Sequence, residues 1–79
     1  MEIKVLGPGC RNCVTLEKVS REVVKELGLN ATIKKVEDYA AIASYGVMST
    51  PALVVDGKVI LSGRVPTRSH LKEVLKSLA

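Results

Sequence analysis

Two short apolar segments, residues 52–55 and 58–61, flank the dipeptide Asp56-Gly57. A two-residue loop between strands needs positive φ angles, which Asp and Gly tolerate, and such a loop closes a hairpin that keeps the native strand twist. The sequence therefore predicts two adjacent antiparallel strands. Any sheet that this chain forms must contain this hairpin.

The N-terminal half of the chain predicts a strand–helix–strand unit. Residues 2–6 alternate between polar and apolar, which is typical of a strand, and the Gly-Pro-Gly run at 7–9 ends it. Over residues 13–27 apolar side chains recur every three or four positions, as on one face of a helix, and Gly28 can end that helix. Residues 31–36 are typical of an edge strand with one solvated face.

Two further helices complete the chain. Asp38 can cap a short one that runs to about Ser44, and Thr67 can cap the last one. Because a crossover between strands of one sheet is right-handed, the first two strands should run parallel. The order is βαβαββα, an α/β class with a four-stranded mixed sheet flanked by three helices, and we expect residues 1–79 to form a single domain.

Composition argues against several classes of protein. The charged residues Glu2 and Lys4, and the lack of an apolar run of about 18 residues, exclude a signal peptide and a membrane span, so we expect a cytoplasmic protein. The net charge of +4 is spread along the chain, and only two tyrosines could stack on bases. We therefore expect neither nucleic acid nor a membrane as a partner, and we expect a monomer.

The two cysteines of the chain, Cys10 and Cys13, lie at the junction of the first strand and the first helix. Chance gives this close spacing about one time in forty. In a reducing compartment such a pair is more often catalytic or metal-binding than a permanent crosslink. The pair is therefore the first candidate for a functional site.

The start of a helix favours a thiolate at Cys10. Unpaired backbone N–H groups and the positive end of the helix dipole stabilise an anion there, and the cation of Arg11 adds to this. We expect a lowered pKa for the Cys10 thiol and assign Cys10 as the nucleophile that attacks a substrate disulfide. Cys13 lies on the apolar stripe, so we expect it to be buried and assign it as the resolving thiol.

The tripeptide Ser49-Thr50-Pro51 directly precedes the hairpin. Proline cannot donate a hydrogen bond to a sheet, so it is typical of a strand start or a sheet edge. Only about 5–6 % of X-Pro bonds in folded proteins are cis. Sequence chemistry alone therefore predicts a trans bond at this position.

Nearly the whole chain resembles the thioredoxin superfamily. Residues 45–53, Tyr-Gly-Val-Met-Ser-Thr-Pro-Ala-Leu, followed by the turn at 56–57 and by Gly63, are similar to the second half of thioredoxin. Residues 10–13, Cys-Arg-Asn-Cys, occupy the redox position of that fold. The Gly-Pro-Gly run at 7–9 and the short length are most similar to the small, glutaredoxin-sized redox-active disulfide proteins of archaea and bacteria.

This resemblance implies a sheet order of 2-1-3-4 and a cis peptide bond between Thr50 and Pro51, beside the cysteines. It also implies that the backbone of Thr50 pairs with an extended segment of a substrate protein, and that Gly63 lets this segment approach. Arg11 and Asn12 replace the Gly-Pro inside the cysteine pair of thioredoxin. We count these two side chains among the candidate substrate contacts.

The implied activity is that of a protein disulfide oxidoreductase whose substrates are disulfide-containing proteins. Its redox group would be the Cys10–Cys13 disulfide, with no other cofactor and no metal. Residues 62–65, Ser-Gly-Arg-Val, replace the glutathione-contacting residues of glutaredoxins, which favours an electron donor of the thioredoxin-reductase type. No acidic residue occupies an inward strand position, so the buried carboxylate that assists the resolving thiol in thioredoxin has no counterpart.

Two other functions are compatible with this pair of cysteines. Two soft thiolates can hold Cu(I) or contribute to a Zn(II) site, as in heavy-metal-associated domains of about 70 residues. Against a metal carrier, Pro8 stands where that family has Met, the chain ends in a helix, and only His70 could add a nitrogen ligand. The other alternative is a non-catalytic interaction module on a thioredoxin scaffold.

Three larger side chains have structural interpretations. We expect Met48 to pack in the interior, and Tyr39 and Tyr45 to lie at the edge of the core. Because the chain has no Trp and no Phe, the core itself should consist of aliphatic side chains.

Overall fold

Four strands and three helices make up the part of the chain that the computed structural model describes, residues 1–9 and 11–78. In chain order they are β1 (Glu2–Leu6), α1 (Arg11–Leu27), β2 (Thr32–Val36), α2 (Tyr39–Ser44), β3 (Ala52–Val55), β4 (Lys58–Ser62) and α3 (Arg68–Leu78). This order confirms the βαβαββα prediction.

The four strands form one mixed sheet in the order β2-β1-β3-β4, which the resemblance implied. β1 runs parallel to β2, with Leu6 opposite Val36, and antiparallel to β3, with Leu6 opposite Ala52. Asp56 and Gly57 join β3 to β4 with φ angles of 49° and 84°, as a two-residue hairpin loop requires. The hairpin, the parallel pair and the edge position of β2 were all predicted correctly.

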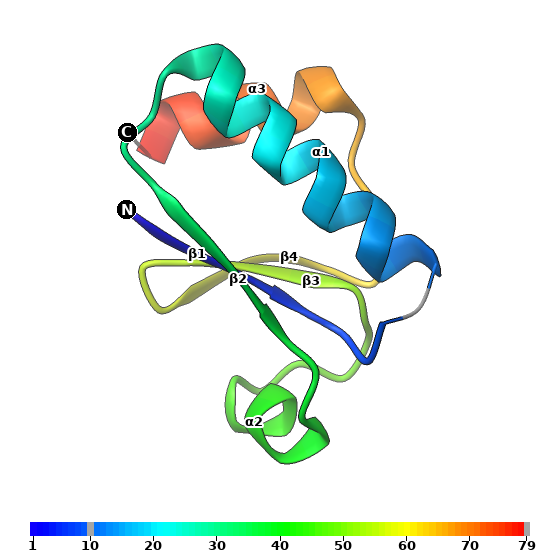
Figure 1. The fold of residues 1–79 in the computed structure, drawn as a ribbon. Coiled ribbons are helices and arrows are strands. Elements are labelled where there is room, and N and C mark those ends of the chain that lie inside the picture. Colours follow the sequence, from blue (N-terminus) through cyan, green and yellow to red (C-terminus); the bar gives the residue numbers. More distant parts are fainter. Residues whose placement is uncertain (10, 79) are drawn as a thin grey trace.

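Helices cover both faces of the sheet, with α1 and α3 on one face and α2 on the other (Figure 1). Side chains alternate along β1 and so serve both faces. Ile3 and Val5 pack under α1 and α3, whereas Lys4 and Leu6 point toward the α2 side. β1 is therefore the central element to which both layers are attached.

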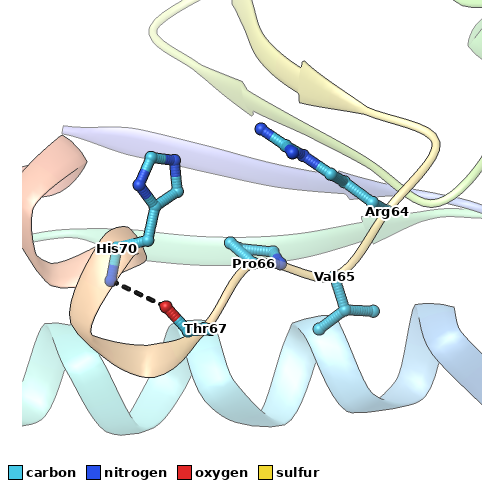
Figure 2. A pocket seen from close by; sticks show the side chains of 5 residues that line it. All are labelled: Arg64, Val65, Pro66, Thr67 and His70. Atoms are coloured by element: carbon cyan, nitrogen blue, oxygen red, sulfur yellow. Dashed lines mark hydrogen bonds between the residues drawn. The ribbon is translucent and has the colours of Figure 1, made fainter.

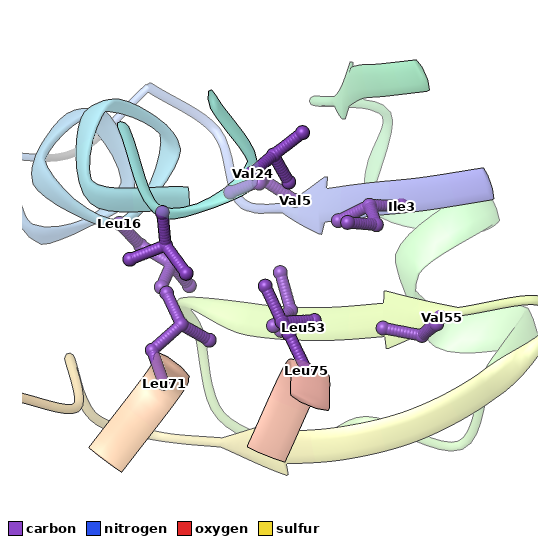
Figure 3. Packing of buried hydrophobic residues seen from close by; sticks show 9 residues of the cluster. Ile3, Val5, Leu16, Val24, Leu53, Val55, Leu71 and Leu75 are labelled. Atoms are coloured by element: carbon purple, nitrogen blue, oxygen red, sulfur yellow. The ribbon is translucent and has the colours of Figure 1, made fainter. Parts of the chain in front are cut away.

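The larger core lies between the sheet and the two helices α1 and α3 (Figure 3). Its buried members are Ile3, Val5, Leu16, Val23, Val24, Leu53, Val55, Leu71 and Leu75. All of them are aliphatic, as the composition predicts. Full burial of each such side chain contributes about 1.5–3 kcal/mol relative to leaving it exposed. This packing holds α1 in place over the end of β1.

The smaller core lies under α2, and its buried members are Leu6, Ile42, Ala52 and Val54. Tyr45 is half-buried at its edge, as predicted, and accepts a hydrogen bond from Nζ of Lys4 at 2.9 Å. This bond, followed by the nearby carboxylate of Glu2, raises the pKa of the Lys4 amino group. The prediction for Tyr39 is wrong: its side chain is 72 % exposed, because α2 has only six residues and buries only Ile42.

Both predicted helix caps are present. Oδ2 of Asp38 accepts a hydrogen bond from the backbone N of Ala41 at 3.3 Å, and Oγ1 of Thr67 accepts one from the backbone N of His70 at 3.2 Å. Within residues 1–9 and 11–78, no helix combines the length and the apolar character that crossing a membrane requires.

Candidate redox site

Cys13 lies in the first turn of α1 as the structure describes it. Its side chain belongs to the stripe that faces the sheet, together with Leu16 and Ser20, and it is 3 % exposed. The predicted burial of Cys13 is therefore confirmed. Cys10, the predicted nucleophile, lies outside the described residues, and its role stays a prediction.

Gly7 is the point at which three segments of the chain meet. It directly follows β1, it is buried, and its backbone N donates a hydrogen bond to the carbonyl O of Val36 at 2.8 Å. A Cβ built on Gly7 would overlap Sγ of Cys13, would lie 3.0 Å from Cβ of Cys13, and would lie 3.8 Å from Cβ of Thr50. The end of β1, the start of α1 and the loop before β3 therefore pack against one another here.

The peptide bond between Thr50 and Pro51 is cis, as the resemblance implied and as sequence chemistry alone did not predict. Pro51 is fully buried, whereas Thr50 is exposed. The carbonyl O of Pro51 accepts a hydrogen bond from the backbone N of Gly63 at 2.8 Å. This bond ties the loop before β3 to the residue that follows β4.

Gly63 is restricted in two ways. Its φ angle is 78°, a backbone conformation that residues other than glycine rarely adopt. A Cβ built on it would also lie 3.2 Å from Cβ of Ser49. Its close neighbour in the structure is therefore Ser49 of the same chain, and the predicted approach of a substrate segment to Gly63 stays a prediction.

Several side chains near these residues face solvent. Arg11 and Asn12 are exposed at the start of α1, where they could contact another molecule. Met48 is 99 % exposed, so the prediction that it packs in the interior is wrong. It lies in the loop between α2 and β3, whose sequence has no periodic pattern that would show which side faces the core.

Glu37 is a residue near the site that the sequence analysis missed. It follows β2 directly, and its Oε2 lies 3.6 Å from the position that a Cβ on Gly9 would occupy. Glu37 lies outside the inward strand positions, where a buried carboxylate was expected. Because β1 and β2 are parallel and Leu6 pairs with Val36, the residues that follow both strands emerge at the same edge of the sheet. The parallel register of the two strands was therefore the signal that could have placed Glu37 near the site.

A cavity of about 360 Å³ lies beyond Gly63, lined by Arg64, Val65, Pro66, Thr67 and His70. Figure 2 shows the side chains of Arg64 and His70 on one side of Pro66, and Val65 turned toward α1. His70, the one nitrogen ligand that the metal alternative had available, thus faces this cavity. Within residues 1–9 and 11–78, no three His, Cys, Asp or Glu side chains gather as a metal site would need.

A mixed sheet of order 2-1-3-4, with a cis-proline loop packed beside a buried cysteine at a helix start, defines a thioredoxin-like protein. Comparison with known proteins agrees with this class. The family model of the thioredoxin domain matches residues 1–76. A thioredoxin of Methanothermobacter thermautotrophicus is 41 % identical over 75 residues, which cover 95 % of this chain and 97 % of the relative.

A second relative, a thioredoxin of Methanocaldococcus jannaschii, is 36 % identical over 75 residues, which cover 95 % of this chain and 86 % of the relative. Both matches extend over almost the full described length rather than over the cysteine segment alone. The chain belongs to the thioredoxin family, and it is a thioredoxin-like redox protein.

Proposed function

We propose that the protein is a thiol-disulfide oxidoreductase that reduces disulfide bonds of other proteins, with Cys10 as the attacking thiol and Cys13 as the resolving thiol. The observation that carries this proposal is the position of Cys13. Its Sγ is buried at the start of α1, against Gly7 and beside the Thr50–Pro51 loop. A sulfur in that position is protected from solvent and lies beside the loop that we propose binds the substrate.

The reaction would proceed by two exchanges. The Cys10 thiolate attacks one sulfur of the substrate disulfide, a mixed disulfide forms, and the other substrate sulfur leaves as a thiolate that takes up a proton. Cys13, after losing its proton, then attacks Sγ of Cys10. The Cys10–Cys13 bond forms, and the second substrate sulfur leaves. The substrate has gained two electrons and two protons, and the protein has lost them.

The exposed residues around Cys13 support binding of an extended substrate segment. Thr50 is accessible, and its loop is held in place by the hydrogen bond from Gly63 to Pro51. The backbone of Thr50 would pair with the substrate segment, as in strand addition. Arg11 and Asn12 face solvent at the start of α1 and would contact residues that flank the substrate disulfide.

No cofactor other than the two cysteines is needed for this reaction. A reductase of the thioredoxin-reductase type would return two electrons and two protons to the Cys10–Cys13 disulfide. The replacement of the glutathione contacts of glutaredoxins by residues 62–65 supports such a donor over glutathione. We assign the reaction to the cytoplasm, where thiols are kept reduced.

The two cysteine variants test the order of the steps. We expect Cys10→Ser to abolish the reduction of a protein disulfide such as that of insulin. Cys13→Ser should still attack but should accumulate a mixed disulfide with the substrate, visible by mass spectrometry of the alkylated mixture. Equal trapping by both variants would contradict the assignment. Stoichiometric copper or zinc in the purified reduced protein, without any reductase activity, would contradict the function itself.

A further inference from the structure

Gly7 differs from the other five glycines of the chain in the reason that it has no side chain. The glycines at 9, 28, 46, 57 and 63 all have positive φ angles. Gly7 does not, so its backbone conformation is open to any residue. What excludes a side chain at Gly7 is space, because a Cβ there would overlap Sγ of Cys13.

We propose that Gly7 is a positioning residue for the resolving thiol. The volume that a side chain at this position would fill is occupied by Sγ of Cys13, and this keeps the sulfur buried next to Thr50. The inference rests on the proposed function, because it concerns the step in which Cys13 attacks the mixed disulfide. It adds Gly7 to the proposed machinery as a residue that is not among the proposed substrate contacts.

The surroundings of Gly7 determine what would move if a side chain were added. On one side, its N–H is bonded to Val36, and the preceding residue, Leu6, is paired with both β2 and β3. On the other side, α1 is packed into the larger core. In the reduced protein, in which the resolving step takes place, rotation of the Cys13 side chain about its Cα–Cβ bond is softer than a shift of either element. The sulfur would therefore turn away from its present position.

A displaced sulfur would affect one step of the reaction. In the resolving step the Cys13 thiolate attacks Sγ of Cys10, the bond between the two cysteines forms, and the bond from Cys10 to the substrate breaks. Misplacement of a reacting group by about 1 Å can lower a rate about a hundredfold. For Gly7→Ala we expect the resolving step to slow at least about tenfold, with little change in the first attack.

An aromatic disulfide separates the two steps in one experiment. The reduced protein attacks dithiobis-nitrobenzoate through Cys10 and releases one coloured thiolate, and attack by Cys13 on the resulting mixed disulfide releases the second. Stopped-flow absorbance should show that Gly7→Ala slows the second phase and leaves the first unchanged. Unchanged second-phase kinetics in this variant would overturn the inference. Absence of a second phase in the unmodified protein would instead overturn the proposed function.

Gly46→Ala is the matched control. Gly46 has a φ angle of 75° and no described neighbour within 4 Å of an added Cβ, so alanine there strains the backbone without touching a cysteine. We expect this variant to lose stability and to keep the normal rate of the second phase. Equal slowing by Gly46→Ala and Gly7→Ala would mean that general destabilisation is the cause, which contradicts the inference.

A double-mutant cycle covers the case in which Gly7→Ala does not fold. Under reducing conditions, the loss in urea midpoint caused by Gly7→Ala should be much smaller in a Cys13→Ala background, because the overlapping sulfur is absent there. Folding of the double variant when the single variant is unfolded would support the inference. An equal loss of stability in both backgrounds, or failure of both variants to fold, would show that the conflict is not with this sulfur.

Discussion

The two ends of the sheet are built in different ways. At the hairpin end, Asp56 donates its N–H to the carbonyl O of Glu2 at 2.8 Å, and its Oδ1 accepts a hydrogen bond from the N–H of Glu2, also at 2.8 Å. A Cβ added to Gly57 would have no neighbour within 4 Å in the described chain. At the redox end, Gly7 and Gly63 lie so close to other segments that a Cβ would be in contact or in overlap.

The difference indicates how each end keeps its shape. Hydrogen bonds between neighbouring strands hold the hairpin end, and there is room around them. At the redox end, the hydrogen bonds from Gly7 to Val36 and from Gly63 to Pro51 are combined with a close approach of neighbouring segments, and this approach depends on the absence of side chains at the two glycines. Substitutions that add volume should therefore cost less stability at the hairpin end than at the end that carries the cysteines.

The largest effect is expected from a pair of alanine variants. Gly57→Ala places a side chain at a φ of 84° in open space and should cost about 1 kcal/mol of unfolding free energy. Gly63→Ala has the same backbone problem at a φ of 78°, and its Cβ would lie 3.2 Å from Cβ of Ser49. It should cost about 1 kcal/mol more, measured by urea denaturation.

The variant Ser49→Gly provides the control for this pair. It removes the side chain that Gly63→Ala would crowd, and it leaves the φ angle of residue 63 as it is. In the Ser49→Gly background the two alanine substitutions should therefore cost about the same. If the gap between them persisted there, close approach to Ser49 would not be its cause.

A smaller effect is expected on the pH profile of Cys10 alkylation when the negative charge of Glu37 is removed. The carboxylate of Glu37 lies next to Gly9, which directly precedes Cys10 in the sequence. Because a negative charge opposes a neighbouring thiolate, Glu37→Gln should move the pH profile of Cys10 alkylation to lower pH. The charge is exposed and screened, so the shift should be on the order of a few tenths of a pH unit at low salt.

Glu2→Gln is the matched charge change at the opposite end of β1. It should leave the alkylation profile unchanged. A shift of equal size in both variants would indicate an effect of net charge alone rather than of the position of Glu37.

The smallest effect is expected on the acid sensitivity of stability, from an ion pair that lies away from both ends of the sheet, where α1 meets α3. Lys72 and then Arg68 lower the pKa of the Glu26 carboxyl from its ordinary value of 4.5. A lowered pKa means that the folded state favours the ionised form. The resulting stabilisation is therefore present above pH 4.5 and is lost as the pH falls through the lowered value.

Glu26→Gln should remove this part of the acid sensitivity. The urea midpoint of the variant should fall slightly less than that of the unmodified protein between pH 5 and pH 3, roughly the range in which carboxyl groups titrate. Because the pair is exposed, the difference should be small and should disappear at about 1 M salt. A difference that survived high salt would point to a cause other than this ion pair.

The same contrast between the two ends explains what could be predicted from the sequence. The hairpin was predicted because Asp56-Gly57 determines its conformation within two residues. The caps at Asp38 and Thr67 were predicted for the same reason, since each bonds to a backbone N only three residues away. Local chemistry was sufficient at all three places.

The redox end could not be predicted in this way. The cis bond between Thr50 and Pro51 was implied only by the resemblance to thioredoxin. Sequence chemistry alone predicted a trans bond, because most X-Pro bonds are trans. Cys13 and Thr50 lie close to the space beside Gly7, and Glu37 lies close to the space beside Gly9, so residues from different elements come together here. No spacing or periodicity along the chain reports such contacts. They become visible only when the register of the strands is known.

The hydrogen bond between Tyr45 and Lys4 has a spectroscopic consequence. The chain has no tryptophan and two tyrosines, and Tyr39 is already largely in water when the protein is folded. A change in ultraviolet emission on unfolding therefore reports on Tyr45 and on the side of the sheet that α2 covers. The emission of a tryptophan-containing partner could be followed during a reaction without overlapping tryptophan emission from this chain.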